Sequence, residues 1–271
     1  MKLRITGIVF ALALLSFQVC GAGAGDAPDA DSIMKKMKDA LEPEIASTRT
    51  LKFTIMDEKG AVTNTWIARE GRMELSNGKR TLLVMLQPEE VKGVARLVWE
   101  KEGGESVQWM YLPALKRIRE MGPIDSYDSF QGTDFTNSDI GFISVRGTHT
   151  LLGETNHKGT TAYSIETVPV QKEKFSKIIT MVAKDSFLPL ERDMYDVNGV
   201  LWKTHFFEDV TVINNIATPL AVRMVDVQTK TSTAYKVDHV CYGAVIPSEI
   251  FEPKNLANAL QFDFCPLPTG E

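Results

Sequence analysis

Four aspartates gather between residues 125 and 139, and they are the residues best placed to do chemistry. Asp125, Asp128, Asp134 and Asp139 could bind Ca²⁺, which prefers carboxylate oxygens, but their spacing does not follow the EF-hand ligand pattern. Aspartates in such a loop more commonly cap helices and close Asx-turns. We therefore expect a structural loop without a metal.

Other catalytic signatures are missing from the sequence. The four histidines, His149, His157, His205 and His239, show no HExxH or comparable metal-ligand spacing. No GxSxG elbow, Walker A loop or GxGxxG motif occurs. We expect neither a cofactor nor an enzymatic activity.

Three basic residues, Lys116, Arg117 and Arg119, precede the acidic loop at strand-like spacing. We expect them at the mouth of a binding site or at a partner surface, where they would hold an anionic headgroup or an acidic patch. A solvated face is the alternative, because long basic side chains often only cover apolar surface.

The composition is that of an ordinary globular protein. The chain has 271 residues, of which 44% are hydrophobic and 24% charged, and its formal net charge is −5. This mild negative charge, without a long basic run, gives no indication of a nucleic-acid partner. The sequence has no linker, repeat or low-complexity stretch, which favours a single domain.

The N-terminus has the pattern of a cleaved secretory signal. Lys2 and Arg4 precede an apolar run from Ile5 to Val19, and the small residues at 22–24 suit signal peptidase. The run is shorter than the roughly 18 residues of a membrane-spanning helix, which disfavours the alternative of a retained anchor. We expect a signal peptide over residues 1–24 and export to the periplasm.

Two cysteines, Cys241 and Cys265, remain once Cys20 has been removed with the signal. An oxidising compartment would let them form a disulfide that ties the C-terminal tail to the last strand. Two separate thiols are the alternative, because pairing depends on a Cα separation that the sequence does not give. No CxxC or Cys/His cluster indicates a zinc site.

One amphipathic helix is expected at the start of the mature chain. Between Asp26 and Pro43 apolar residues recur at helical spacing, Asp29 or Asp31 can cap the first turn, and Pro43 follows the end. Such a helix must bury its apolar stripe on something. The sheet that follows is the only candidate.

After this helix the apolar period changes to two, which predicts strands joined by tight turns. Asn77-Gly78 and Asn198-Gly199 mark two of these turns. We expect one domain over residues 25–271, an up-and-down antiparallel meander of about eleven or twelve strands. At most short helices are expected near Asp139 and between Pro247 and Leu260.

Several strands carry large apolar groups on both faces, unlike the clean alternation of a two-sheet sandwich. Examples are residues 82–86, 94–99 and 201–207. One face could meet the helix and the other a cavity lined by adaptable methionines, whereas ordinary core strands are the alternative. The residues that we expect to line such a cavity are Trp66, Met85, Leu97, Trp99, Trp109 and Phe206.

The segments YLPALKRIRE (111–120) and SFQGTDFTNSDI (129–140) resemble the signature of the outer-membrane lipoprotein-sorting-like family, relatives of the periplasmic carrier LolA. The layout of signal, N-terminal helix, long meander and Ile-Phe-Glu-Pro at 250–253 is similar too. After GTDF, however, the chain has Thr-Asn-Ser-Asp-Ile, where the family commonly has an aromatic residue and consecutive acids.

The resemblance implies a mainly β fold with few helices, an open half-barrel wrapped around an apolar cavity with helices as a lid. The structural loop motif would be Gly132, Thr133, Asp134 and Phe135. The implied function is a non-enzymatic periplasmic carrier that binds lipid or lipoprotein acyl chains and passes them toward the outer membrane. Members are often associated with RND-type exporters, which implies an inner-membrane transporter as partner.

Two alternatives of other classes stay open, and we expect a monomer in each case. One is a structural accessory subunit of an envelope transport complex with a filled core and no ligand. The other is an enzyme that modifies envelope lipids.

Overall fold

The structure is a computed structural model that describes residues 28–101, 106–122, 128–140, 146–170 and 174–262. The expected signal peptide at 1–24 and Cys265 lie outside the described residues, so the signal and the disulfide stay predictions. Cys241 lies half-buried in the last strand. No helix in the described ranges is long and apolar enough to cross a membrane.

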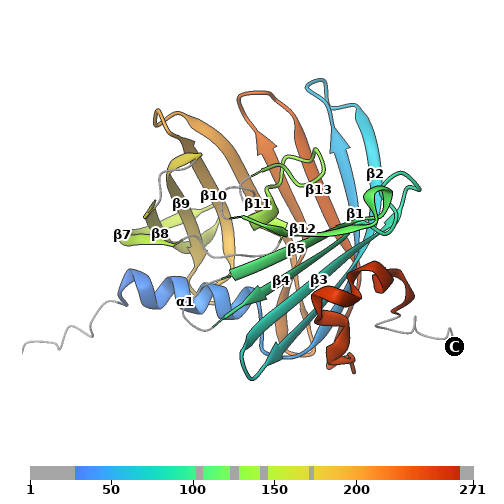
Figure 1. The fold of residues 1–271 in the computed structure, drawn as a ribbon. Coiled ribbons are helices and arrows are strands. Elements are labelled where there is room, and N and C mark those ends of the chain that lie inside the picture. Colours follow the sequence, from blue (N-terminus) through green and yellow to red (C-terminus); the bar gives the residue numbers. More distant parts are fainter. Residues whose placement is uncertain (1–27, 102–105, 123–127, 141–145, 171–173, 263–271) are drawn as a thin grey trace, which may run out of the picture.

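One antiparallel sheet of 13 strands curves into an open half-barrel (Figure 1). Its strands are β1 (Ser47–Met56), β2 (Val62–Leu75), β3 (Gly78–Gln87), β4 (Ala95–Glu100), β5 (Ser106–Leu112), β6 (Arg117–Met121), β7 (Gly147–His157), β8 (Thr160–Pro169), β9 (Phe175–Ala183), β10 (Pro189–Asp196), β11 (Leu201–Ile213), β12 (Ile216–Asp226) and β13 (Ser232–Tyr242). Consecutive strands pair directly except β6 and β7, which form the two edges, while β1 pairs with β13 in the middle. The expected fold class is confirmed, with slightly more strands than expected.

Helix α1 (Ala30–Leu41) lies across one end of the concave side of the sheet (Figure 1). Asp29 caps it, because its carboxylate accepts a hydrogen bond of 2.8 Å from the backbone N–H of Ser32. Its apolar stripe packs on β8 and β9 through the buried residues Ala30, Ile33, Met37, Tyr163, Ile165 and Val182. The helix and its burial on the sheet are therefore as the sequence predicts.

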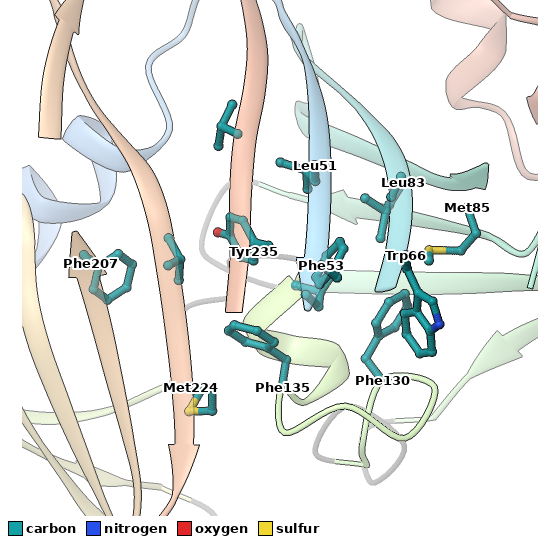
Figure 2. Close-up of a cluster of buried hydrophobic side chains, with 14 of the residues drawn as sticks. Leu51, Phe53, Trp66, Leu83, Met85, Phe130, Phe135, Phe207, Met224 and Tyr235 are labelled. Atoms are coloured by element: carbon teal, nitrogen blue, oxygen red, sulfur yellow. The ribbon is translucent and has the colours of Figure 1, made fainter. Parts of the chain in front are cut away.

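Residues 128–140, which end in the short helix α2 (Asn137–Ile140), fill the middle of the concave side. Phe130 and Phe135 are each 1% exposed. Figure 2 shows both rings pointing at the central strands, where they meet Phe53, Trp66, Met224 and Tyr235. This part of the half-barrel is a packed core.

The outer face of β3, β4 and β5 is covered by the C-terminal 3₁₀ helices η3 (Ser248–Phe251) and η4 (Pro253–Gln261). A third short helix, η1 (Pro113–Leu115), joins β5 to β6. The second apolar face of these strands therefore meets the C-terminal helices. This corrects the expectation that the N-terminal helix and a cavity would take the two faces.

Candidate functional site

A cavity of about 880 Å³ lies between α1 and the concave face of the sheet. Its volume falls in the range of roughly 300–1,000 Å³ that is typical of small-molecule sites. Helix α1 forms its roof, and β9, β10 and β11 form much of its floor. The apolar part of the wall includes Met34, Met37, Leu41, Phe175, Ile178, Met194 and Phe207.

The six residues expected to line a cavity lie elsewhere. Trp66 and Met85 face the concave side but are buried in the packed core with Phe130. Leu97, Trp99 and Trp109 face outward.

The C-terminal 3₁₀ helices bury these outward residues. The Trp99 indole N–H donates a hydrogen bond of 2.7 Å to the carbonyl of Phe251. Phe206 also faces outward, where the guanidinium of Arg223 lies 4.1 Å from its ring centroid. The residues that line the cavity thus differ from the expected set. For the four outward residues the reason is the face of the strand, because successive side chains of a strand point to opposite sides of the sheet.

The three basic residues do not line the cavity either. Lys116 follows η1 in a left-handed conformation with φ 49°, and Arg117 and Arg119 are exposed on the edge strand β6. Their place on an edge strand suits a partner surface rather than the mouth of the cavity.

The Gly132–Phe135 motif is held by its own hydrogen bonds and by the sheet. The Thr133 hydroxyl donates to the Phe130 carbonyl at 2.7 Å. The Asp134 carboxylate accepts hydrogen bonds of 2.5 and 2.7 Å from the hydroxyls of Thr231 and Thr233. These contacts anchor the loop that carries Phe135 to β13.

The remaining acids of this segment also have structural partners. The Asp139 carboxylate accepts hydrogen bonds from the N–H and the hydroxyl of Thr136 at 2.8 and 2.7 Å, which caps α2. Asp128 pairs with Lys174 at 2.7 Å, and Asp125 lies outside the described residues. No group of three potential metal ligands forms within the described part of the chain.

The C-terminal end of α1 is tied to the sheet by charged groups. Lys38 forms an ion pair with Glu100 at the end of β4. The ammonium of Lys79 on β3 donates to the carbonyl of Glu42 at 2.8 Å and lies 3.7 Å from its carboxylate. Arg72 of β2 donates to the carbonyl of Leu41 at 3.4 Å. These contacts hold the roof of the cavity over β2, β3 and β4.

Glu42 gives this attachment a pH dependence. Its side chain is buried, and burial raises its pKa from 4.5 to about 7, although Arg72 and Lys38 oppose the shift. The folded state therefore binds a proton more tightly than the unfolded state. The contribution of Glu42 to the free energy of unfolding should be largest below pH 4.5 and fall as the pH rises to about 7, by about 1.4 kcal/mol per pKa unit.

The Glu42→Gln variant tests this, because glutamine does not titrate. We expect the difference in unfolding free energy between wild type and variant to shift against the wild type between pH 5 and pH 8, measured by urea denaturation. Subtracting the two profiles cancels the other titrating groups. Parallel profiles would contradict a raised pKa at Glu42.

Polar residues on the cavity wall are the functional candidates that the sequence did not single out. His149 shares a hydrogen bond of 2.8 Å between its Nδ1 and the Thr167 hydroxyl. Burial lowers the pKa of His205 to about 3, so its ring is neutral at physiological pH. Burial also lowers the pKa of Arg192, which Asp139 partly offsets. The sequence around Arg192, LERDMY, reads as an ordinary amphipathic strand and carries no signal for a site.

Comparison with known proteins agrees with this architecture. A domain described as outer membrane lipoprotein-sorting, from Vibrio parahaemolyticus, superposes with a TM-score of 0.76 at 23% identity, covering 84% of this chain and 98% of that one. A DUF1329 family protein from Desulfovibrio piger gives 0.75 at 23% identity, covering 85% and 100%. A LolA superfamily protein from Nitrosomonas europaea gives 0.67 at 17% identity, covering 83% and 98%.

These likenesses define the chain as a protein of LolA-like fold. A family model with the description "Uncharacterized protein" matches residues 77–258, more than half of the chain, and the chain belongs to that family. The search of curated proteins gives no match.

Proposed function

We propose that this protein is a periplasmic carrier that binds lipid or lipoprotein acyl chains under α1 and passes them toward the outer membrane. The observation that carries the proposal is the cavity of about 880 Å³ with its apolar wall. Each buried CH₂ contributes about 0.8 kcal/mol, so such a wall can hold an acyl chain without covalent chemistry. The LolA-like fold shared with a lipoprotein-sorting domain supports the same function.

Release of the cargo would require the roof to move or an acceptor to compete for the chain. Helix α1 is suited to such movement, because its C-terminal end is attached to the sheet through the ion pairs Lys38–Glu100 and Glu42–Lys79, which can open without covalent change. The proposed activity is binding and transfer, without a covalent step.

The cavity-filling variant Met34→Trp tests where the cargo binds. Met34 lies on α1 and lines the cavity, so an indole there would occupy the space of the acyl chain. We expect binding of a fluorescent fatty acid to weaken by at least about tenfold, or about 1.4 kcal/mol. The matched control is Val212→Trp, because Val212 is 68% exposed on β11, and its binding should equal that of wild type. Equal binding by all three proteins would contradict the site.

Native mass spectrometry of protein taken from the periplasm separates the carrier from an accessory subunit. A carrier should retain a co-purifying lipid. Loss of both this lipid and fatty-acid binding would favour a structural subunit without a ligand.

For delivery we propose an inner-membrane RND-type transporter as partner, contacted through the basic residues of the edge strand. Lys116, Arg117 and Arg119 are exposed side by side there, which supports a contact with an acidic surface. Replacing all three with glutamate should weaken the association with the transporter in a pull-down and leave fatty-acid binding unchanged.

A further inference from the structure

Three polar side chains occupy neighbouring positions of one cross-strand row at the floor of the cavity, and two of them, Arg192 and His205, line it. Arg192 of β10 lies in register with Thr180 of β9 and with His205 of β11. On either side the row continues with the apolar residues Ile165 and Met224. The three polar residues thus lie between apolar residues of the same row, and we call them the polar row.

The polar row lacks hydrogen-bond partners within the described part of the protein. The Thr180 hydroxyl, the Nε of Arg192 and both ring nitrogens of His205 are buried and unpaired. Arg192 also forms no ion pair with any carboxylate that the structure describes. Buried polar groups in proteins are almost always paired, so a group of three unpaired ones indicates a missing partner.

The charge of the missing partner follows from the surroundings. On the roof side, the acids Asp39, Glu42 and Glu100 each lie close to a lysine. Asp139 also lines the cavity, but its carboxylate is engaged by Thr136. Asp139 favours the charged form of Arg192 from within the same cavity. No carboxylate of the described residues forms an ion pair with Arg192, so its positive charge is not directly neutralised.

Apolar residues flank the polar row along the same strands. Two residues away on the same face lie Ile178 on β9, Met194 on β10 and Phe207 on β11, all of which line the cavity. A ligand with a charged end and an apolar tail would therefore find both contacts within one pocket.

We propose that the polar row binds the anionic headgroup, a carboxylate or a phosphate, of an amphiphile whose acyl chain lies on this apolar wall. The proposal rests on the carrier function and names the headgroup of its cargo. The planar guanidinium of Arg192 can donate two parallel hydrogen bonds to either anion. The neutral ring of His205, which also lines the cavity, can donate one more.

A series of ligands with one chain length tests the proposal on the wild-type protein. Dodecanoate, dodecyl phosphate and dodecanol would each compete with a bound fluorescent fatty acid. We expect at least one anion to bind ten times more tightly than dodecanol, and the tighter of the two distinguishes a fatty acid from a phosphate-bearing lipid. Equal binding of all three would overturn the headgroup site and leave the carrier function intact, whereas no binding by any would overturn both.

The Arg192→Gln variant identifies the residue. It should lose the preference for anions while its affinity for dodecanol stays within about twofold of wild type. Arg223→Gln is the matched control, because Arg223 pairs with Glu208 on the outer face and lies outside the cavity lining. A preference for anions that persists in Arg192→Gln would overturn the assignment. If the variant fails to fold, the ligand series on the wild type decides alone.

Discussion

The Phe135→Ala variant should lose about 3–5 kcal/mol of the free energy of unfolding, the range for removing a buried phenylalanine ring. Phe135 is 1% exposed, and its ring centroid lies 5.6 Å from that of Tyr235, 6.5 Å from that of Phe53 and 5.5 Å from that of His205. The ring is the central contact between the loop 128–140 and the sheet. Equilibrium urea denaturation measures the loss.

Phe206→Ala is the matched control for this prediction. Phe206 is half-buried on the outer face of β11, and the next residue, Phe207, faces the concave side. It should lose clearly less stability than Phe135→Ala. Equal losses would show that the loop does not depend on the Phe135 ring.

Glu70→Ala is expected to have an effect of similar size, about 3–5 kcal/mol, because it removes the buried carboxylate that lies against two buried arginines. Glu70 is 2% exposed. Its carboxylate accepts a hydrogen bond of 2.7 Å from Arg72 and lies 3.9 Å from Nε of Arg49. Since Arg72 also contacts the end of α1, the variant should loosen the roof as well as the sheet.

Two further variants separate the causes of this loss. Glu58→Ala removes an exposed glutamate from the turn between β1 and β2 and should change the urea midpoint little. Glu70→Gln keeps the shape of the side chain but removes its charge, so its free energy of unfolding should lie between those of wild type and Glu70→Ala. A loss at Glu70 no larger than that at Glu58 would contradict a stabilising role for the buried pair.

Local signals in the sequence are sufficient to predict most of the elements. The helix follows from its apolar spacing and the Asp29 cap, and the hairpin at Asn77-Gly78 from its turn residues. Gly78 has φ 112°, and a side chain there would overlap the carbonyl oxygen of Glu100. The turn between β11 and β12 also needs residues with positive φ. Asn214 and Asn215 take φ 51° and 62°, a conformation that asparagine adopts more readily than most residues but less readily than glycine.

The cavity could not be placed from the sequence, because alternation shows that a strand has two faces but not what covers each one. Leu97 and Trp99 are as apolar as any lining residue, yet η3 and η4 bury them from the outside. The polar row depends on a register between three strands. Thr180, Arg192 and His205 are 12 and 13 residues apart in the chain, and only pairing of β9, β10 and β11 brings them together.

Two parts of the concave side fit two different functional alternatives, the subunit without a ligand and the carrier. Its middle is filled by Phe130 and Phe135, as a subunit without a ligand would require, while the part under α1 stays open. A single half-barrel thus combines a packed centre with a cavity at one side. The two share residues, because Phe175, Ile178 and Met194 of the cavity wall belong to the same cluster as Phe135.

The pairing of β1 with β13 has a consequence for how the molecule forms. Residues such as Phe53 and Tyr235, which lie at opposite ends of the described chain, must meet before the two halves of the sheet are joined. Closing so long a loop is entropically costly and slows folding. Strands β2 to β6 and β7 to β12 can each form their own hairpins first, but a chain that is still being synthesised cannot unite them until β13 has been made. Until then the concave surface that would hold the cargo does not exist as one surface.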